Sequence, residues 1–129
     1  MAQEKNFENK VKDFLKAEGC WFIKYWSGSS GNGKKFTKDG IPDLLVCCNG
    51  YFLGVELKAP NGKPSELQLK TLEKITMANG LAFILYPKNF ADFKAVIHAI
   101  KEGVEPEDLI EEFEFLSDWW HLRRKMYES

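Results

Sequence analysis

The sequence predicts an α/β domain built from four strands and surrounding helices. Three observations support this fold class: an N-terminal segment with helical spacing, an Asn-Gly dipeptide between two strand-like segments, and an apolar run between two further helical segments. The chain has 129 residues, of which 44% are hydrophobic and 14% aromatic, and this suffices for one domain with a substantial core. We expect a single domain over residues 1–129, with a core at about 3–103 and a C-terminal helical extension at about 105–127.

The N-terminal part of the chain predicts a helix, a strand and a loop. Residues 3–18 carry apolar side chains at helical spacing, and Gly19 ends the pattern as a C-terminal cap does. Aromatic and β-branched residues over 20–26 indicate a strand. Residues 27–33 are too rich in glycine and serine for regular structure, so we expect a loop there.

Two strand-like segments, residues 41–48 and 51–58, are joined by Asn-Gly, the strongest short-range signal for a type I′ hairpin. If those two residues form the loop, the residue numbers of each cross-strand pair add up to 99. Asp43 then lies opposite Glu56. The register therefore predicts two neighbouring carboxylates.

Side chains of a strand alternate between its two faces, so the second segment has two distinct sides. The expected core side consists of Tyr51, Leu53, Val55 and Leu57, and the other side of Phe52, Gly54, Glu56 and Lys58. Asp43, Glu56 and Lys58 should therefore project from the same side of the hairpin.

The remainder of the chain adds helices and one more strand. The predicted elements are a helix at 65–79, a continuous apolar strand at 81–86 and a capped helix at 89–102. From Pro106 onward, acidic residues come early, basic residues come late, and an apolar stripe predicts a closing helix. The element order is α-β-β-β-α-β-α, followed by this extra C-terminal helix.

Composition narrows the classes of function. The formal net charge is −1, so any binding to nucleic acid must come from a local basic patch. No apolar run is long enough to span a bilayer and the N-terminus lacks the apolar stretch of a secretory signal, so we expect a cytoplasmic protein without a membrane partner. Three cysteines without CxxC spacing suggest neither a disulfide framework nor a structural zinc site.

The opposed carboxylates indicate a metal site. Like charges at directly opposed positions destabilise a sheet. Mg²⁺ offsets this repulsion, because it is typically held by one or two carboxylates together with waters and substrate phosphate. Lys58 adds an ammonium group that can orient a nucleophile or stabilise charge on phosphoryl oxygens. The reaction class indicated is phosphodiester hydrolysis.

The segment Gly40-Ile41-Pro42-Asp43, followed by Glu56-Leu57-Lys58, resembles the PD-(D/E)xK motif of the restriction-endonuclease-like nucleases. The virus-type replication-repair nuclease (VRR-NUC) family is the more similar branch. Its features here are GIPDLL, VELKAPNGKPS, a glutamine near the start of the next helix, and an N-terminal helix that bears Glu8. The resemblance covers roughly residues 3–86 and implies a central mixed sheet of four strands flanked by helices.

The resemblance also implies roles for individual residues. Asp43 and Glu56 would ligate Mg²⁺, for which Mn²⁺ can substitute, and the Leu57 carbonyl would be a further ligand. Lys58 would act on the attacking water. The two remaining members of the catalytic set would be Glu8 and Gln68.

The resemblance further implies a metal-dependent DNA endonuclease that is structure-specific on branched DNA, like a Holliday junction resolvase. Its setting would be phage or mobile-element replication and repair, and it would act as a homodimer. The basic residues that we expect to contact DNA phosphates are Lys34, Lys35, Lys38 and Lys63. The first three could instead keep a loop solvated.

Each site residue also has a purely structural interpretation. Asp43 could follow a proline in a turn that opens the strand. Glu56 and Lys58 could belong to a solvated strand face. Glu8 lies at the border of the apolar stripe and could be a flanking charge. Gln68 fits a Ser-x-x-Gln capping box, which explains it without catalysis.

Two other functions are possible for the whole chain. One is a nucleic-acid-binding module that keeps the nuclease fold without cleaving, although a pure binder gains nothing from opposed carboxylates. The other is an unrelated α/β domain in which the motif is fortuitous.

Overall fold

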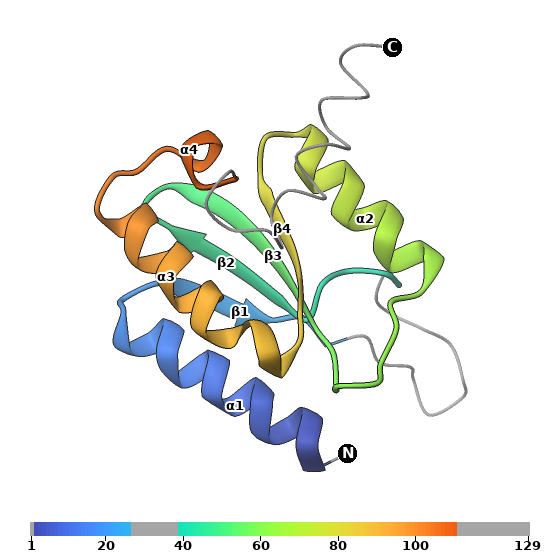
Figure 1. Ribbon diagram of the computed structural model, residues 1–129. Coiled ribbons are helices and arrows are strands. Elements are labelled where there is room, and N and C mark those ends of the chain that lie inside the picture. Colours follow the sequence, from blue (N-terminus) through green and yellow to red (C-terminus); the bar gives the residue numbers. More distant parts are fainter. Residues whose placement is uncertain (1, 27–38, 111–129) are drawn as a thin grey trace.

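The computed structural model describes residues 2–26 and 39–110, and these residues form a four-stranded sheet with helices on both faces (Figure 1). The elements are α1 (Ala2–Ala17), β1 (Trp21–Lys24), β2 (Leu44–Cys48), β3 (Tyr51–Leu57), α2 (Glu66–Met77), β4 (Leu81–Leu85), the 3₁₀ helix η1 (Pro87–Asn89), α3 (Phe90–Lys101) and α4 (Pro106–Ile110). The predicted α/β class is confirmed.

The sheet has the strand order β1-β2-β3-β4. The pairs β1–β2 and β2–β3 are antiparallel, whereas β3 and β4 are parallel and are connected through α2. The predicted mixed sheet is therefore confirmed. Because parallel strands end at the same edge, Leu57 at the end of β3 pairs with Leu85 at the end of β4.

The hairpin between β2 and β3 has the predicted register. Its pairs run from Cys48↔Tyr51 to Leu44↔Val55, and the residue numbers of each pair add up to 99. Positive φ values at both loop residues allow the tight turn. However, β2 begins at Leu44 and not near residue 41, since Pro42 has no N–H to donate to a ladder.

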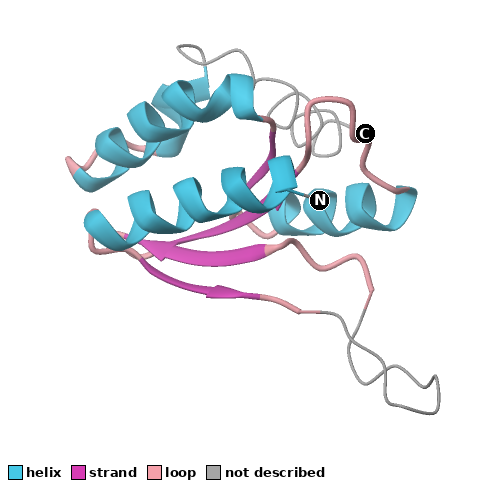
Figure 2. Ribbon diagram, turned by 90° about the horizontal axis from the view of Figure 1, so that it is seen from below, coloured by secondary structure: helices cyan, strands magenta, loops and turns pink. Residues whose placement is uncertain are grey.

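The apolar core lies between the sheet and the pair of helices α1 and α3, which run along the same face (Figure 2). Leu53, Val55 and Leu57 of β3 are buried there, as alternation predicts. Edge-to-face ring contacts join the two helices: Phe14 of α1 lies 6.1 Å from Phe90 and 6.2 Å from Phe93, measured between ring centroids.

Helix α2 covers the opposite face of β3 and β4. A Cβ atom added at Gly54 of β3 would lie 2.7 Å from Cδ1 of Ile75 in α2, so the helix and the strand approach closely. Leu72 and Thr76 of α2 are also buried. The face of β3 that carries Glu56 is therefore closed over by a helix.

Part of the predicted organisation lies outside the described residues. The helical extension at about 105–127 is described only as far as Ile110, and the loop with Lys34, Lys35 and Lys38 is not described. Among the helices of residues 2–26 and 39–110, none is both long and apolar enough to cross a membrane.

The segment that leads into Asp43 packs against the first turn of α2. Gly40 has a φ of +81°, and a Cβ atom there would lie 2.6 Å from Cγ and 3.0 Å from the carbonyl oxygen of Leu67. Only glycine combines this backbone conformation with so close an approach. Gly40 thus allows the chain to reach Asp43 along the start of α2.

We predict that Gly40→Ala lowers the free energy of unfolding by about 2–4 kcal/mol, since it adds steric overlap to the cost of a left-handed backbone. Gly19→Ala is the matched control, because Gly19 has a similar φ of +75° and its Cβ would meet nothing within 4 Å. We expect the control to lose only about 1 kcal/mol. Urea unfolding of both variants measures the difference, and equal losses would contradict the packing of this segment on α2.

Candidate functional site

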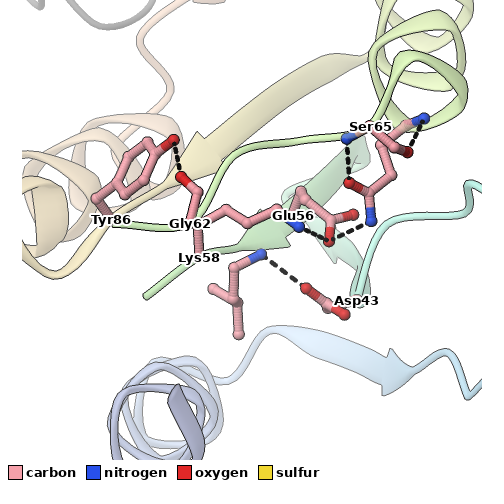
Figure 3. A network of polar contacts seen from close by, with 8 residues as sticks. Asp43, Glu56, Lys58, Gly62, Ser65 and Tyr86 are labelled. Carbon is pink, nitrogen blue, oxygen red and sulfur yellow. Dashed lines mark hydrogen bonds and ion pairs between the residues drawn. The ribbon is translucent and has the colours of Figure 1, made fainter. Parts of the chain in front are cut away.

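Glu56 is a buried carboxylate with one unsatisfied oxygen. The residue is only 2% exposed. Its Oε1 accepts a hydrogen bond from Nε2 of Gln68 at 3.1 Å and lies 3.7 Å from Nζ of Lys58 (Figure 3). Its Oε2 is buried and has no hydrogen-bond partner among the described residues. The alternative that Glu56 belongs to a solvated strand face is therefore wrong.

Asp43 is fixed between two strands although it precedes β2. Its Oδ2 accepts a hydrogen bond from the backbone N–H of Leu57 at 2.8 Å, and its carbonyl oxygen accepts one from the N–H of Tyr25 at 2.8 Å. The Asp43 side chain thus accepts a hydrogen bond from the last residue of β3, as a backbone carbonyl of a neighbouring strand would (Figure 3). The alternative that Asp43 only opens the strand after Pro42 does not explain its hydrogen bond with Leu57.

The carboxylates of Asp43 and Glu56 perturb one another. Burial and the adjacent carboxylate of Asp43 together raise the pKa of Glu56 to about 8, and Lys58 offsets only part of this effect. A carboxyl group with such a pKa keeps its proton at neutral pH unless a cation replaces the proton. The pair therefore either shares a proton or holds a positive ion.

Gln68 takes part in the cap of α2 and also contacts Glu56. Its side-chain oxygen Oε1 accepts a hydrogen bond from the backbone N–H of Ser65, and its backbone N–H donates one to Oγ of Ser65. These two bonds complete the predicted capping box. The same side chain donates to Glu56 through Nε2. The two interpretations of Gln68 are thus compatible, because the cap fixes the amide that orients Glu56.

Glu8 forms a separate charged cluster. It is 7% exposed, forms an ion pair with Lys24 of β1, and lies 3.5 Å from Nζ of Lys12. Burial acts to raise the pKa of Glu8, but the hydrogen bonds and charges of these two lysines outweigh it and hold the pKa below its ordinary value. The described residues contain no group of three or more His, Cys, Asp or Glu side chains placed to hold a metal, so Glu8 does not form such a group with Asp43 and Glu56.

The basic residues are only partly placed. Lys63 lines a pocket beside the end of β4, whereas Lys34, Lys35 and Lys38 lie outside the described residues. Sequence reasoning did not single out Lys24, which forms an ion pair with Glu8. It also did not single out the residues other than Lys63 that line the pocket. The pocket could have been anticipated from the rule that parallel strands end at one edge, because residues after β4 must then lie beside Lys58.

The donor set fits a hard divalent cation. Asp43 and Glu56 offer carboxylate oxygens, and Oε2 of Glu56 is a buried acceptor for which residues 2–26 and 39–110 supply no donor. Mg²⁺ requires no more than one or two carboxylates when waters and phosphate complete its coordination. Leu57 is held by its N–H to Asp43, and a role for its carbonyl as a further ligand stays a prediction.

Comparisons with known proteins assign no family to this chain. It matches no protein-family profile, no curated protein and no solved structure. A functional proposal therefore depends on the chemistry of Asp43, Glu56 and Lys58.

We predict that the metal-free protein loses stability as the pH rises from 4.5 toward about 8, because Glu56 releases its proton near 4.5 in the unfolded chain but near 8 in the folded one. The slope should reach up to about 1.4 kcal/mol per pH unit. Urea unfolding in EDTA measures it. Glu56→Gln should flatten the curve, and Glu102→Gln, at an exposed carboxylate, should not. The same slope in wild type and in Glu56→Gln would contradict the assigned cause.

Proposed function

We propose that this protein is a Mg²⁺-dependent DNA endonuclease that hydrolyses phosphodiester bonds at Asp43, Glu56 and Lys58. One observation carries the proposal: Glu56, whose buried Oε2 has no partner in the part of the chain that the structure describes, forms a carboxylate pair with Asp43 and lies beside the ammonium group of Lys58. Placing the half-buried Asp43 carboxylate beside the buried Glu56 carboxylate is costly, because like charges repel one another and burial penalises the charged form. A role in binding a cation accounts for this arrangement, because the ion offsets the repulsion.

Each residue has a defined part in this chemistry. Asp43 and Glu56 would hold the cation, with the Leu57 carbonyl as a further ligand, and Gln68 keeps the Glu56 carboxylate oriented. A bound Mg²⁺ supplies Lewis-acid polarisation of the phosphate and lowers the pKa of a coordinated water. Lys58, with 17% of its side chain exposed, can reach both the buried carboxylate and a phosphate arriving from solvent. Its ammonium group orients the attacking water and stabilises charge on the phosphoryl oxygens.

The positive charge of residues near Lys58 supports a phosphate substrate. The whole chain has a net charge of −1, yet the described residues that line the pocket next to Lys58 include Lys63 and Lys88 and no acidic residue. An anionic backbone is attracted to such a local patch. DNA as the substrate is favoured by the resemblance to the PD-(D/E)xK nucleases and their VRR-NUC branch.

The same resemblance favours a homodimer that acts on branched DNA, as in a junction-resolving enzyme of phage or mobile-element repair. Light scattering of the purified protein measures its mass, and a panel of linear, flapped and four-way-branched DNA measures the preferred shape. A non-catalytic binding module would bind members of that panel without cutting any of them.

We predict that Asp43→Ala and Lys58→Ala each reduce Mg²⁺-dependent cleavage by about 100-fold or more, since each removes a group that acts on the reacting phosphate. Lys10→Ala, at an exposed position of α1, is the control and should cleave like wild type. Circular dichroism verifies that all variants are folded. Wild type that cuts none of the panel with Mg²⁺ or Mn²⁺, or variants as active as wild type, would contradict the proposal.

A second prediction concerns the competition between a proton and the metal for Glu56. Mn²⁺ should raise the melting temperature more at pH 8 than at pH 6, because binding must displace the proton that Glu56 keeps up to a pKa of about 8. Glu56→Gln should remove most of this stabilisation. A Mn²⁺ effect that is independent of pH and survives in Glu56→Gln would place the ion elsewhere.

A further inference from the structure

A pocket of about 730 Å³ lies at the same edge of the sheet as the candidate active site. It is formed by the loop that follows β3 and by the residues that follow β4. The lining residues that matter here are Pro60, Gly62, Lys63, Tyr86, Pro87 and Lys88. None of them belongs to the carboxylate site.

The pocket and the candidate active site share a wall. The hydroxyl of Tyr86 donates a hydrogen bond to the carbonyl oxygen of Gly62 at 2.8 Å, which ties the loop to the end of β4 (Figure 3). A Cβ atom added at Gly62 would lie 3.4 Å from Cδ of Lys58. The stem of Lys58 therefore runs past the loop that closes the pocket, with Glu56 beyond it.

The lining combines a flat apolar surface with positive charge. Tyr86 lines the pocket together with two prolines, Pro60 and Pro87, and with the exposed lysines Lys63 and Lys88. Nζ of Lys88 lies 5.9 Å from the centroid of the Tyr86 ring. Aromatic rings that stack on bases, together with cations that contact the backbone, characterise sites for single-stranded nucleic acid.

We infer that this pocket binds one unpaired nucleotide of the strand that is cut, with its base against Tyr86 and its phosphate between Lys63 and Lys88. The inference rests on the proposed function for the identity of the strand. A base inside a duplex is covered on both faces by its neighbours, so it cannot lie against Tyr86 unless it leaves the stack. The pocket thus favours DNA that has an unpaired nucleotide next to the scissile phosphate.

Binding can be tested without cleavage. Fluorescence anisotropy in EDTA compares a labelled oligothymidylate with a duplex of the same length. Tyr86→Leu should weaken single-strand binding about tenfold, because base stacking is lost, while Tyr86→Phe keeps the ring and most of the affinity. Duplex binding should change little in either variant.

The lysines give a second, independent readout. Lys88→Gln should lower the slope of log affinity against log salt by about 0.7 for the single strand, whereas Tyr86→Leu should leave this slope unchanged. Lys10→Gln, with the same change of charge on α1, is the matched control. Lys88 is exposed, so this variant tests the pocket even if Tyr86→Leu fails to fold.

The outcomes separate this inference from the nuclease proposal. Mg²⁺-dependent cleavage together with unchanged single-strand binding in Tyr86→Leu and Lys88→Gln would overturn the pocket assignment and leave the nuclease intact. Loss of single-strand binding in both variants, with no cleavage by wild type, would support the pocket as a nucleotide site and contradict the nuclease. Thymidine monophosphate that competes as strongly as the oligomer would overturn the assignment of a strand as the ligand.

Discussion

The placement of a half-buried carboxylate, Asp43, beside a buried one, Glu56, is the constraint on which this structure depends. Burial and the adjacent Asp43 raise the pKa of Glu56 to about 8, and one oxygen of Glu56 has no partner among the described residues. Such a pair needs either a shared proton or a cation. The surrounding contacts hold it in place: Asp43 is fixed by the N–H of Leu57, and Glu56 by the amide of Gln68.

The topology of the sheet determines what lies around this pair. One face of β3 packs into the apolar core with α1 and α3, and its other face is closed by α2, whose capping residue Gln68 contacts Glu56. Since β3 and β4 are parallel, the residues that follow them share one edge. Lys58 therefore lies between the carboxylates on one side and the loop around Gly62 on the other, where Tyr86 forms the pocket.

Local signals in the sequence were sufficient for much of this arrangement. The Asn-Gly turn gave the hairpin register, and alternation gave the core face of β3, both of which are confirmed. Other features depend on contacts between segments that are distant in the sequence, and the spacing of apolar residues does not predict such contacts. The burial of Glu56 requires the packing of α2, the ion pairs of Glu8 require the neighbouring strand β1, and the pocket at Tyr86 requires the parallel pairing of β4.

The most direct test of the account is a crystal structure of the protein grown with Mn²⁺, with diffraction data collected for anomalous scattering. We predict an anomalous peak in contact with carboxylate oxygens of both Asp43 and Glu56, with Oε2 of Glu56 among the ligands. A crystal saturated with Mn²⁺ that shows no peak between these carboxylates, or in which their oxygens point away from each other, would contradict the central claim.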